Sequence, residues 1–194
     1  PDRFPWDDDI FCAFAARIGA DGLRLDAYQR IESEKGLPEA FCALSAKMDE
    51  ASAQAASDAA DKVLCFKVVL DQLSSNYNGN TYLNTMNREA VDHFIELTHE
   101  EYVKHCGDRV GRTIQGVFTD EPHRGFAMNN YSEADGIRSS SMFYTDDIFD
   151  EFQLRYGYDA AALLPELFYR LHGEPISKVR IDYFDLGCNL FNER

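Results

Sequence analysis

Two apolar stretches of the chain predict buried strands. Residues 63–70 are almost continuously apolar, which is typical of a strand covered on both faces. Residues 113–118 combine β-branched and aromatic side chains, and Pro122 follows them. Between the two, Asn87 is expected to cap a helix that ends at Gly107 and whose apolar positions share one face: Val91, Phe94, Ile95, Thr98, Tyr102 and Cys106. The order of strand, helix and strand predicts a βαβ unit with parallel strands.

Residues 1–62 are predicted to be mostly helical. Their main pattern is an apolar stripe at helical spacing that ends before Gly19: Ile10, Phe11, Phe14 and Ile18. The acidic run at residues 7–9 resembles a metal cluster, but it is more typical of favourable charges at a helix N-terminus. Later helices are expected to begin at Thr145, Asp159 and Ser177.

The two predicted strands both end in acids and lead into polar loops. In parallel α/β folds, ligands bind at the carboxyl ends of the strands. The sequence therefore predicts a partial (β/α)8 TIM barrel with parallel strands and a helix-rich periphery. Residues 1–194 are expected to form a single domain, with residues 1–62 as its helical N-terminal portion.

Composition limits the partners of the chain. Its 194 residues carry a formal net charge of −15, which opposes binding to nucleic acid and to anionic membranes. The five cysteines are scattered and lack CxxC spacing, so we expect reduced thiols rather than disulfides or a zinc knuckle. No stretch is apolar enough to span a bilayer, and no signal peptide opens the sequence. The location stays open, with the cytoplasm favoured.

Glu121 is the candidate catalytic residue. Pro122 favours an extended backbone at Glu121, and a carboxylate at the end of a buried strand is costly unless it has a partner or a task. Because side chains alternate along a strand, Asp120 is expected to point to the opposite face, so a second catalytic carboxylate must come from elsewhere. The alternative reading is that both acids merely begin the next segment.

A polar and aromatic loop supplies the candidate substrate-binding residues. Aromatic rings stack on the C–H faces of sugars, while amides and carboxylates bind hydroxyls. The candidates are Asp71, Tyr77, Asn78, Tyr82, Asn84, Asp120 and His123. No cofactor and no metal are expected. A calcium- or magnesium-dependent hydrolase using Asp120, Glu121 and His123 is a weaker alternative, since three nearly consecutive ligands rarely converge on one ion.

Several segments resemble one family of enzymes. They are residues 82–84, 87–91, 94–102, the Gly-Val-Phe-Thr-Asp-Glu-Pro run at 116–122, and residues 145–149, 155–159, 164–168 and 179–183. Together they resemble large bacterial TIM-barrel glycoside hydrolases similar to the α-L-rhamnosidases and their uncharacterised relatives. The resemblance covers residues 63–194, whereas residues 1–62 show no motif of that family.

The resemblance implies an activity and a site. It implies hydrolysis of O-glycosidic bonds in plant or host glycans, with Glu121 as the general acid and residues 77–84 lining the sugar pocket. It also implies that the second carboxylate lies beyond Arg194 and that this chain is about half of a barrel. Half a barrel exposes sheet edges, which favours a homo-oligomer. The alternative is a non-catalytic carbohydrate-binding or structural fragment of such an enzyme.

Overall fold

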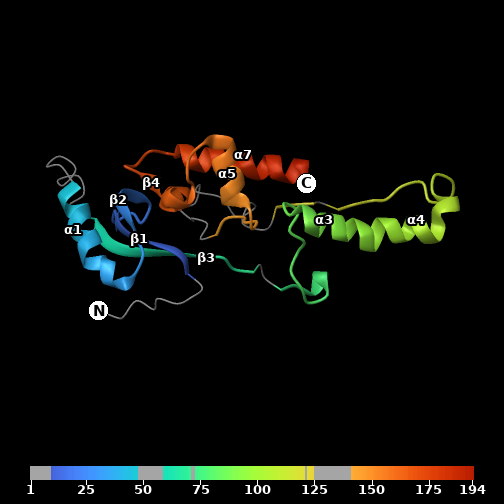
Figure 1. The fold of residues 1–194 in the computed structure, drawn as a ribbon, viewed down its shortest axis with the longest axis horizontal. Helices are drawn as coiled ribbons and strands as arrows, with labels where there is room; N and C mark the ends of the chain where they lie inside the picture. Colours follow the sequence, from blue (N-terminus) through green and yellow to red (C-terminus); the bar gives the residue numbers. More distant parts are fainter. Residues whose placement is uncertain (1–9, 48–58, 71–72, 121, 125–140) are drawn as a thin grey trace. The chain divides into compact units, whose positions relative to one another are not determined.

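The computed structural model describes residues 10–47, 59–70, 73–120, 122–124 and 141–194 (Figure 1). The chain divides into two compact units. Unit 1 comprises residues 1–69 and 149–184, and unit 2 comprises residues 70–148 and 185–194.

Unit 1 contains an open four-stranded sheet. Its strands are β1 (Ile10–Ile18), β2 (Arg24–Ile31), β3 (Ala60–Lys67) and β4 (Arg170–Leu171), in the order β3-β1-β2-β4. β1 pairs antiparallel with both β2 and β3, and only the short β2–β4 pair is parallel. The sheet is therefore mixed and mostly antiparallel.

The turn between β1 and β2 is set by local sequence. The carboxylate of Asp21 accepts hydrogen bonds from the backbone N–H groups of Leu23 (2.9 Å) and Arg24 (3.0 Å). Gly22 adopts φ +70, a left-handed conformation that glycine reaches without steric cost. These contacts turn the chain back so that β2 lies beside β1.

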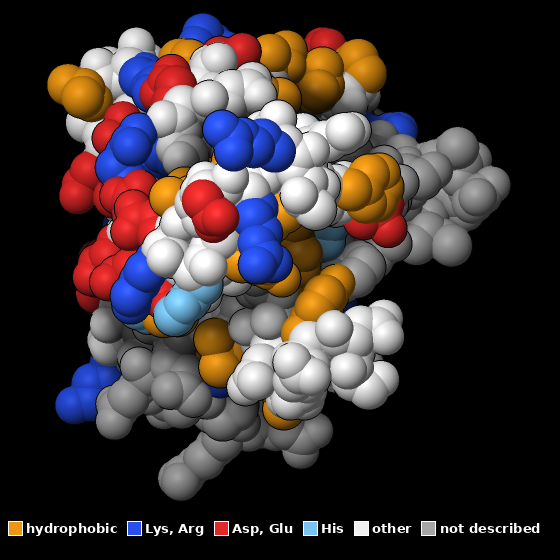
Figure 2. All heavy atoms as spheres, turned by 90° about the vertical axis from the view of Figure 1, so that its right-hand side faces the viewer, with side chains coloured by type: hydrophobic (Ala, Val, Ile, Leu, Met, Phe, Trp, Pro, Cys, Tyr) orange, Lys and Arg blue, Asp and Glu red, His pale blue; other side chains and the backbone are white. Residues whose placement is uncertain are grey.

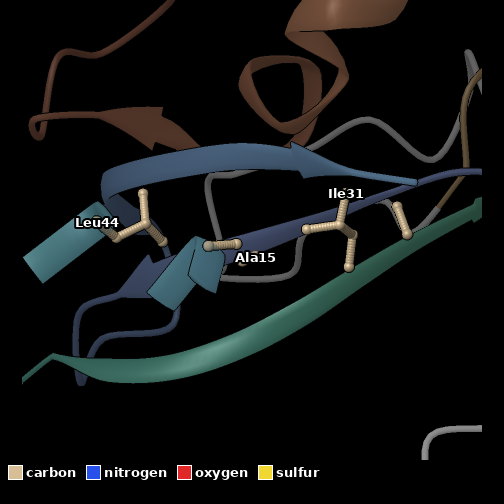
Figure 3. Packing of buried hydrophobic residues seen from close by; sticks show 5 residues of the cluster. Ala15, Ile31 and Leu44 are labelled. Atoms are coloured by element: carbon tan, nitrogen blue, oxygen red, sulfur yellow. The ribbon is translucent and has the colours of Figure 1, made fainter. Parts of the chain in front are cut away.

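Helix α1 (Leu37–Lys47) covers one face of the sheet. Leu44 of this helix is fully buried with Ala15 of β1 and Ile31 of β2, as Figure 3 shows. On the other face, Leu25 packs with Ile18. The ring of Phe14 contacts the rings of Tyr28 and Phe66. The ring of Phe66 in turn contacts that of Phe168. Because both faces are covered, β1 is apolar along most of its length.

Three helices follow residue 141. They are α5 (Ile148–Tyr156), α6 (Leu164–Phe168) and α7 (Lys178–Glu193). Gly157, at φ +77, follows α5. Asp159 accepts from the N–H of Ala161 at 2.8 Å, and the Ser177 hydroxyl accepts from the N–H of Arg180 at 3.3 Å. The helix start predicted at Ser177 is confirmed by its hydrogen bond. At Asp159 the prediction holds only in part, because a 3-10 turn (Ala161–Leu163) follows it before α6 begins. The start predicted at Thr145 is not confirmed, because α5 begins at Ile148 and the buried hydroxyl of Thr145 has no hydrogen-bond partner among the described residues.

Unit 2 contains the long helix that the sequence predicted. It runs through α3 (Arg88–Ile95), a π-helical turn (Glu96–Glu100) and α4 (Glu101–Cys106), which Figure 1 shows as one continuous helix. The Asn87 side chain accepts from the N–H of Ala90 at 3.0 Å, so the predicted cap is confirmed. None of its residues is buried, and Figure 2 shows hydrophobic side chains between acidic and basic ones on this side of the molecule.

The predicted parallel barrel is wrong. Residues 113–120 form no strand: Ile114 makes one isolated bridge with Val110, and residues Val117 and Phe118 are 68% and 87% exposed. β3 pairs with β1 instead, and it does so antiparallel. The prediction of a βαβ unit rested on the order of elements, which does not specify the partner of a strand.

The prediction of helices in residues 10–31 is also wrong. The spacing of Ile10, Phe14 and Ile18 fits a helix, yet these residues lie in β1. All of the residues from Cys12 to Ala16 are buried, as expected for a central strand. A short continuous apolar run fits a buried strand as well as a helix, so periodicity alone could not decide. Within residues 10–47 the structure describes one α-helix, α1, preceded by a short 3-10 turn (Glu34–Gly36).

Candidate functional site: an aromatic cluster in unit 2

The loop that carries the first candidate residues is a compact turn. The N–H of Ser74 donates to the carbonyl of Asn80 (3.0 Å), and the N–H of Gly79 donates to the carbonyl of Ser74 (2.9 Å). Asn78 has φ 55 and Gly79 has φ +81, a pair of left-handed conformations that asparagine and glycine tolerate best. The turn leaves Asn78 exposed and Tyr77 half-buried.

Three rings meet beside this turn. The rings of Tyr77 and Tyr82 meet edge-on, with centroids 5.3 Å apart and an interplanar angle of 61°. Tyr82 stacks on His123 with centroids 3.9 Å apart and planes at 14°. All three side chains are half-buried, so each ring retains some exposed surface. We call Tyr77, Tyr82 and His123 the aromatic cluster.

Hydrogen bonds to the backbone hold the aromatic cluster in place. The hydroxyl of Thr85 donates to the carbonyl of His123 at 2.7 Å. The side chain of Asn84 accepts from the N–H of Met86 (3.1 Å) and donates to the carbonyl of Tyr144 (3.5 Å). Both the oxygen and the nitrogen of the Asn84 amide therefore bind backbone groups of the protein. Asn84 is thus a residue that positions the backbone around Met86.

Arg124, which follows His123, contacts the C-terminal part of α7. Its guanidinium donates to the sulfur of Cys188 at 2.7 Å and lies 5.8 Å from the centroid of the Phe191 ring. These contacts fix the backbone next to His123. Sequence reasoning did not identify Arg124 or Thr85, because their partners are distant in the chain and no local motif marks them.

The end of α7 also supports the segment after Asn84. Arg194 donates to the carbonyl of Met86 (2.8 Å) and makes two hydrogen bonds to the carboxylate of Asp147 (2.9 and 2.7 Å). The hydrogen bond from Arg194 is the main reason why the pKa of Asp147 lies below its ordinary value. Met86 is buried beneath these contacts.

The acidic candidates are not placed in the aromatic cluster by the described residues. Asp120 lies in an exposed segment. Glu121 and Asp71 lie outside the described residues. Within the described ranges, no group of three or more His, Cys, Asp or Glu side chains is arranged to hold a metal ion. In the same ranges no helix has the length and apolar character needed to cross a membrane.

Comparison with known proteins does not assign this chain to a family. No family model, no curated protein and no solved structure matches this chain. Three half-buried aromatic rings, with the exposed Asn78 following Tyr77 in the same turn, can bind a ligand that offers both apolar faces and hydroxyl groups.

Proposed function

We propose that this chain is part of a glycoside hydrolase in which the aromatic cluster binds a sugar and Glu121 is the general acid. The proposal is supported by one observation above all, the stacking of Tyr82 on His123 at 3.9 Å. This contact joins the loop expected to bind sugar to a residue only two positions after Glu121. The resemblance of residues 116–122 to glycoside hydrolases supports the same activity.

The chemistry of each group fits this role. Sugar rings present C–H faces that pack on aromatic rings, and their hydroxyls suit the amide of Asn78. A protonated carboxyl group at Glu121 would donate its proton to the glycosidic oxygen as the bond to the leaving group breaks. Because the described residues do not form the parallel barrel of the resembled family, the proposal depends on these site residues and not on the fold.

Replacement of the acid tests the catalytic part of the proposal. In the full-length protein of which this chain is proposed to be a part, Glu121→Gln should lower the turnover of glycosides with poor leaving groups by roughly 10²–10⁴-fold, since those leaving groups need a proton. Glycosides with strongly acidic leaving groups should be affected much less. Glu100→Gln, at an exposed position of the π-helical turn, is the matched control. Unchanged turnover in Glu121→Gln would remove Glu121 from the mechanism.

A second candidate is carbohydrate binding without hydrolysis. The aromatic cluster favours it, because three half-buried rings can bind a sugar without any carboxylate. Calorimetric titration with sugars, combined with a hydrolysis assay on the same preparation, separates the two functions. The assay uses the full-length protein of which this chain is proposed to be a part, because the second carboxylate is expected beyond Arg194. Binding with no product would then favour the second candidate, and binding with product would favour the first.

A further inference from the structure

We propose that β3 is a dimerisation edge, through which two copies of this chain join by antiparallel pairing of their β3 strands about Leu64. The proposal is independent of the proposed function, because β3 belongs to unit 1 and the aromatic cluster to unit 2. It would convert two four-stranded sheets into one continuous sheet.

β3 has the properties of an edge that can accept another strand. Within the described part of the chain it pairs with β1 alone, and it is the outer strand of the sheet. It is eight residues long and contains neither proline nor glycine. No residue of β3 is buried, although residues 63–66 are all apolar. Exposed backbone groups along a long apolar edge favour pairing with a further strand.

Charge selects the register of the pairing. With Leu64 opposite Leu64 of the partner subunit, Asp61 lies opposite Lys67 of the partner subunit, and the two-fold axis repeats this pair. Opposite charges that face each other across antiparallel strands stabilise the pairing. A shift by two residues, the smallest that keeps the facing side chains on the same face of the sheet, would remove this pair, because neither Asp61 nor Lys67 would then face an opposite charge.

The neighbourhood of Asp61 suits this role. Arg17 of β1 donates to the Asp61 carboxylate at 3.0 Å, which holds the carboxylate at the strand, and the Asp61 side chain is still 44% exposed. Although the whole chain carries a charge of −15, β3 itself contains two lysines and one aspartate. The proposed contact is therefore less acidic than the rest of the molecule, which weakens the repulsion between copies.

The same register extends both faces of the core. Val63 and Cys65 pack against the cluster under α1, and Leu64 packs against the cluster on the opposite face. In the proposed register Val63 lies opposite Cys65 of the partner subunit. Both apolar layers would then continue across the interface, which buries the side chains that β3 leaves half-exposed.

Sedimentation velocity over a range of concentrations tests the proposal on the whole chain. We expect a dimer that dissociates on dilution. Lys67→Glu and Asp61→Lys each place like charges opposite one another, so each should raise the dissociation constant roughly tenfold or more. An equimolar mixture of the two variants should form a heterodimer, because each variant then faces opposite charges at both pairs.

A second variant and a control variant guard the test against simple loss of folding. Asp61→Lys also removes the contact with Arg17, so circular dichroism must show that it folds, and Lys67→Glu provides a variant that leaves that contact intact. Lys62→Glu is the matched control, because residue 62 would face Phe66 of the partner subunit. A wild-type chain that stays monomeric at all concentrations, or a dimer equally affected by all three variants, would overturn the proposal.

Discussion

The ring of Tyr82 stacks on the ring of His123, with centroids 3.9 Å apart and an interplanar angle of 14°. Neither residue lies in a helix or strand. Thr85 holds the His123 carbonyl, and Asn84 binds the carbonyl of Tyr144, so side chains near Tyr82 fix the backbone on both sides of the contact. The stack is thus supported before any ligand binds, and pre-organisation of this kind lowers the cost of binding.

Removal of the Tyr82 ring should weaken sugar binding. Tyr82→Ala takes away one stacking surface and the support of His123, and we expect the dissociation constant for a bound sugar to rise about tenfold, corresponding to roughly 1.4 kcal/mol. Tyr82→Phe keeps the ring and should retain most of the affinity. Isothermal titration calorimetry measures both.

Tyr102→Ala is the control for this prediction. Tyr102 lies on α4 with 65% of its surface exposed, outside the aromatic cluster. It should leave the affinity for sugar unchanged. Equal losses in Tyr82→Ala and Tyr102→Ala would mean that the effect on binding is not specific to the aromatic cluster.

Tyr28 should make the free energy of unfolding decrease with rising pH in the alkaline range. Its hydroxyl donates to Glu166 of α6 at 2.5 Å. Burial, followed by this hydrogen bond and the charge of Glu166, raises the pKa of Tyr28 above its ordinary value. The folded state therefore favours the protonated tyrosine. Its stabilising contribution is fully present below about pH 10, where unfolded tyrosine is also protonated, and is lost as the pH rises further.

Tyr28→Phe tests this dependence. At neutral pH the variant should lose about 1–2 kcal/mol of the free energy of unfolding, because the hydrogen bond to Glu166 is gone. Above about pH 10 the difference from the wild type should shrink, since the wild type alone loses the contribution of Tyr28. Urea unfolding between pH 7 and 11 gives both quantities. A difference that stays constant over this range would contradict the prediction.

Truncation of Leu44 should lower the free energy of unfolding more than truncation of any other residue of α1. It is fully buried against Ala13, Ala15 and Ile31. Leu44→Ala removes buried methyl groups and leaves a cavity, so the free energy of unfolding should fall by roughly 2–5 kcal/mol. Leu154→Ala, at a position 80% exposed on α5, should change it by less than about 0.5 kcal/mol. Similar losses in both variants would contradict the assigned core.

Part of the fold could be predicted because its signals are local. Asn87 caps the long helix through a residue three positions away, and Asp159 and Ser177 act over two and three positions. Such hydrogen bonds depend on neighbouring residues alone. β3 was also predictable as a strand, although it ends at Lys67 and residues 68–70 lie outside it.

Part of the candidate site followed from residue type. Tyr77, Tyr82 and His123 were candidates because their chemistry suits a sugar, and the structure brings these three together. The contacts of Arg124 and Thr85 could not be predicted, since each depends on how distant segments of the chain meet. The role of Asn84 in holding the backbone likewise depends on Tyr144.

By itself, the sequence determined the helix caps at Asn87 and Ser177, the apolar strand β3 and the residue types available for binding. Only the tertiary structure decided that residues 10–18 are a strand, that β3 pairs antiparallel with β1, and that residues 113–120 remain outside the sheet. The physical reason is that a continuous apolar run gains stability from burial on any partner surface. Which surface it meets is decided by pairing with segments far away in the chain.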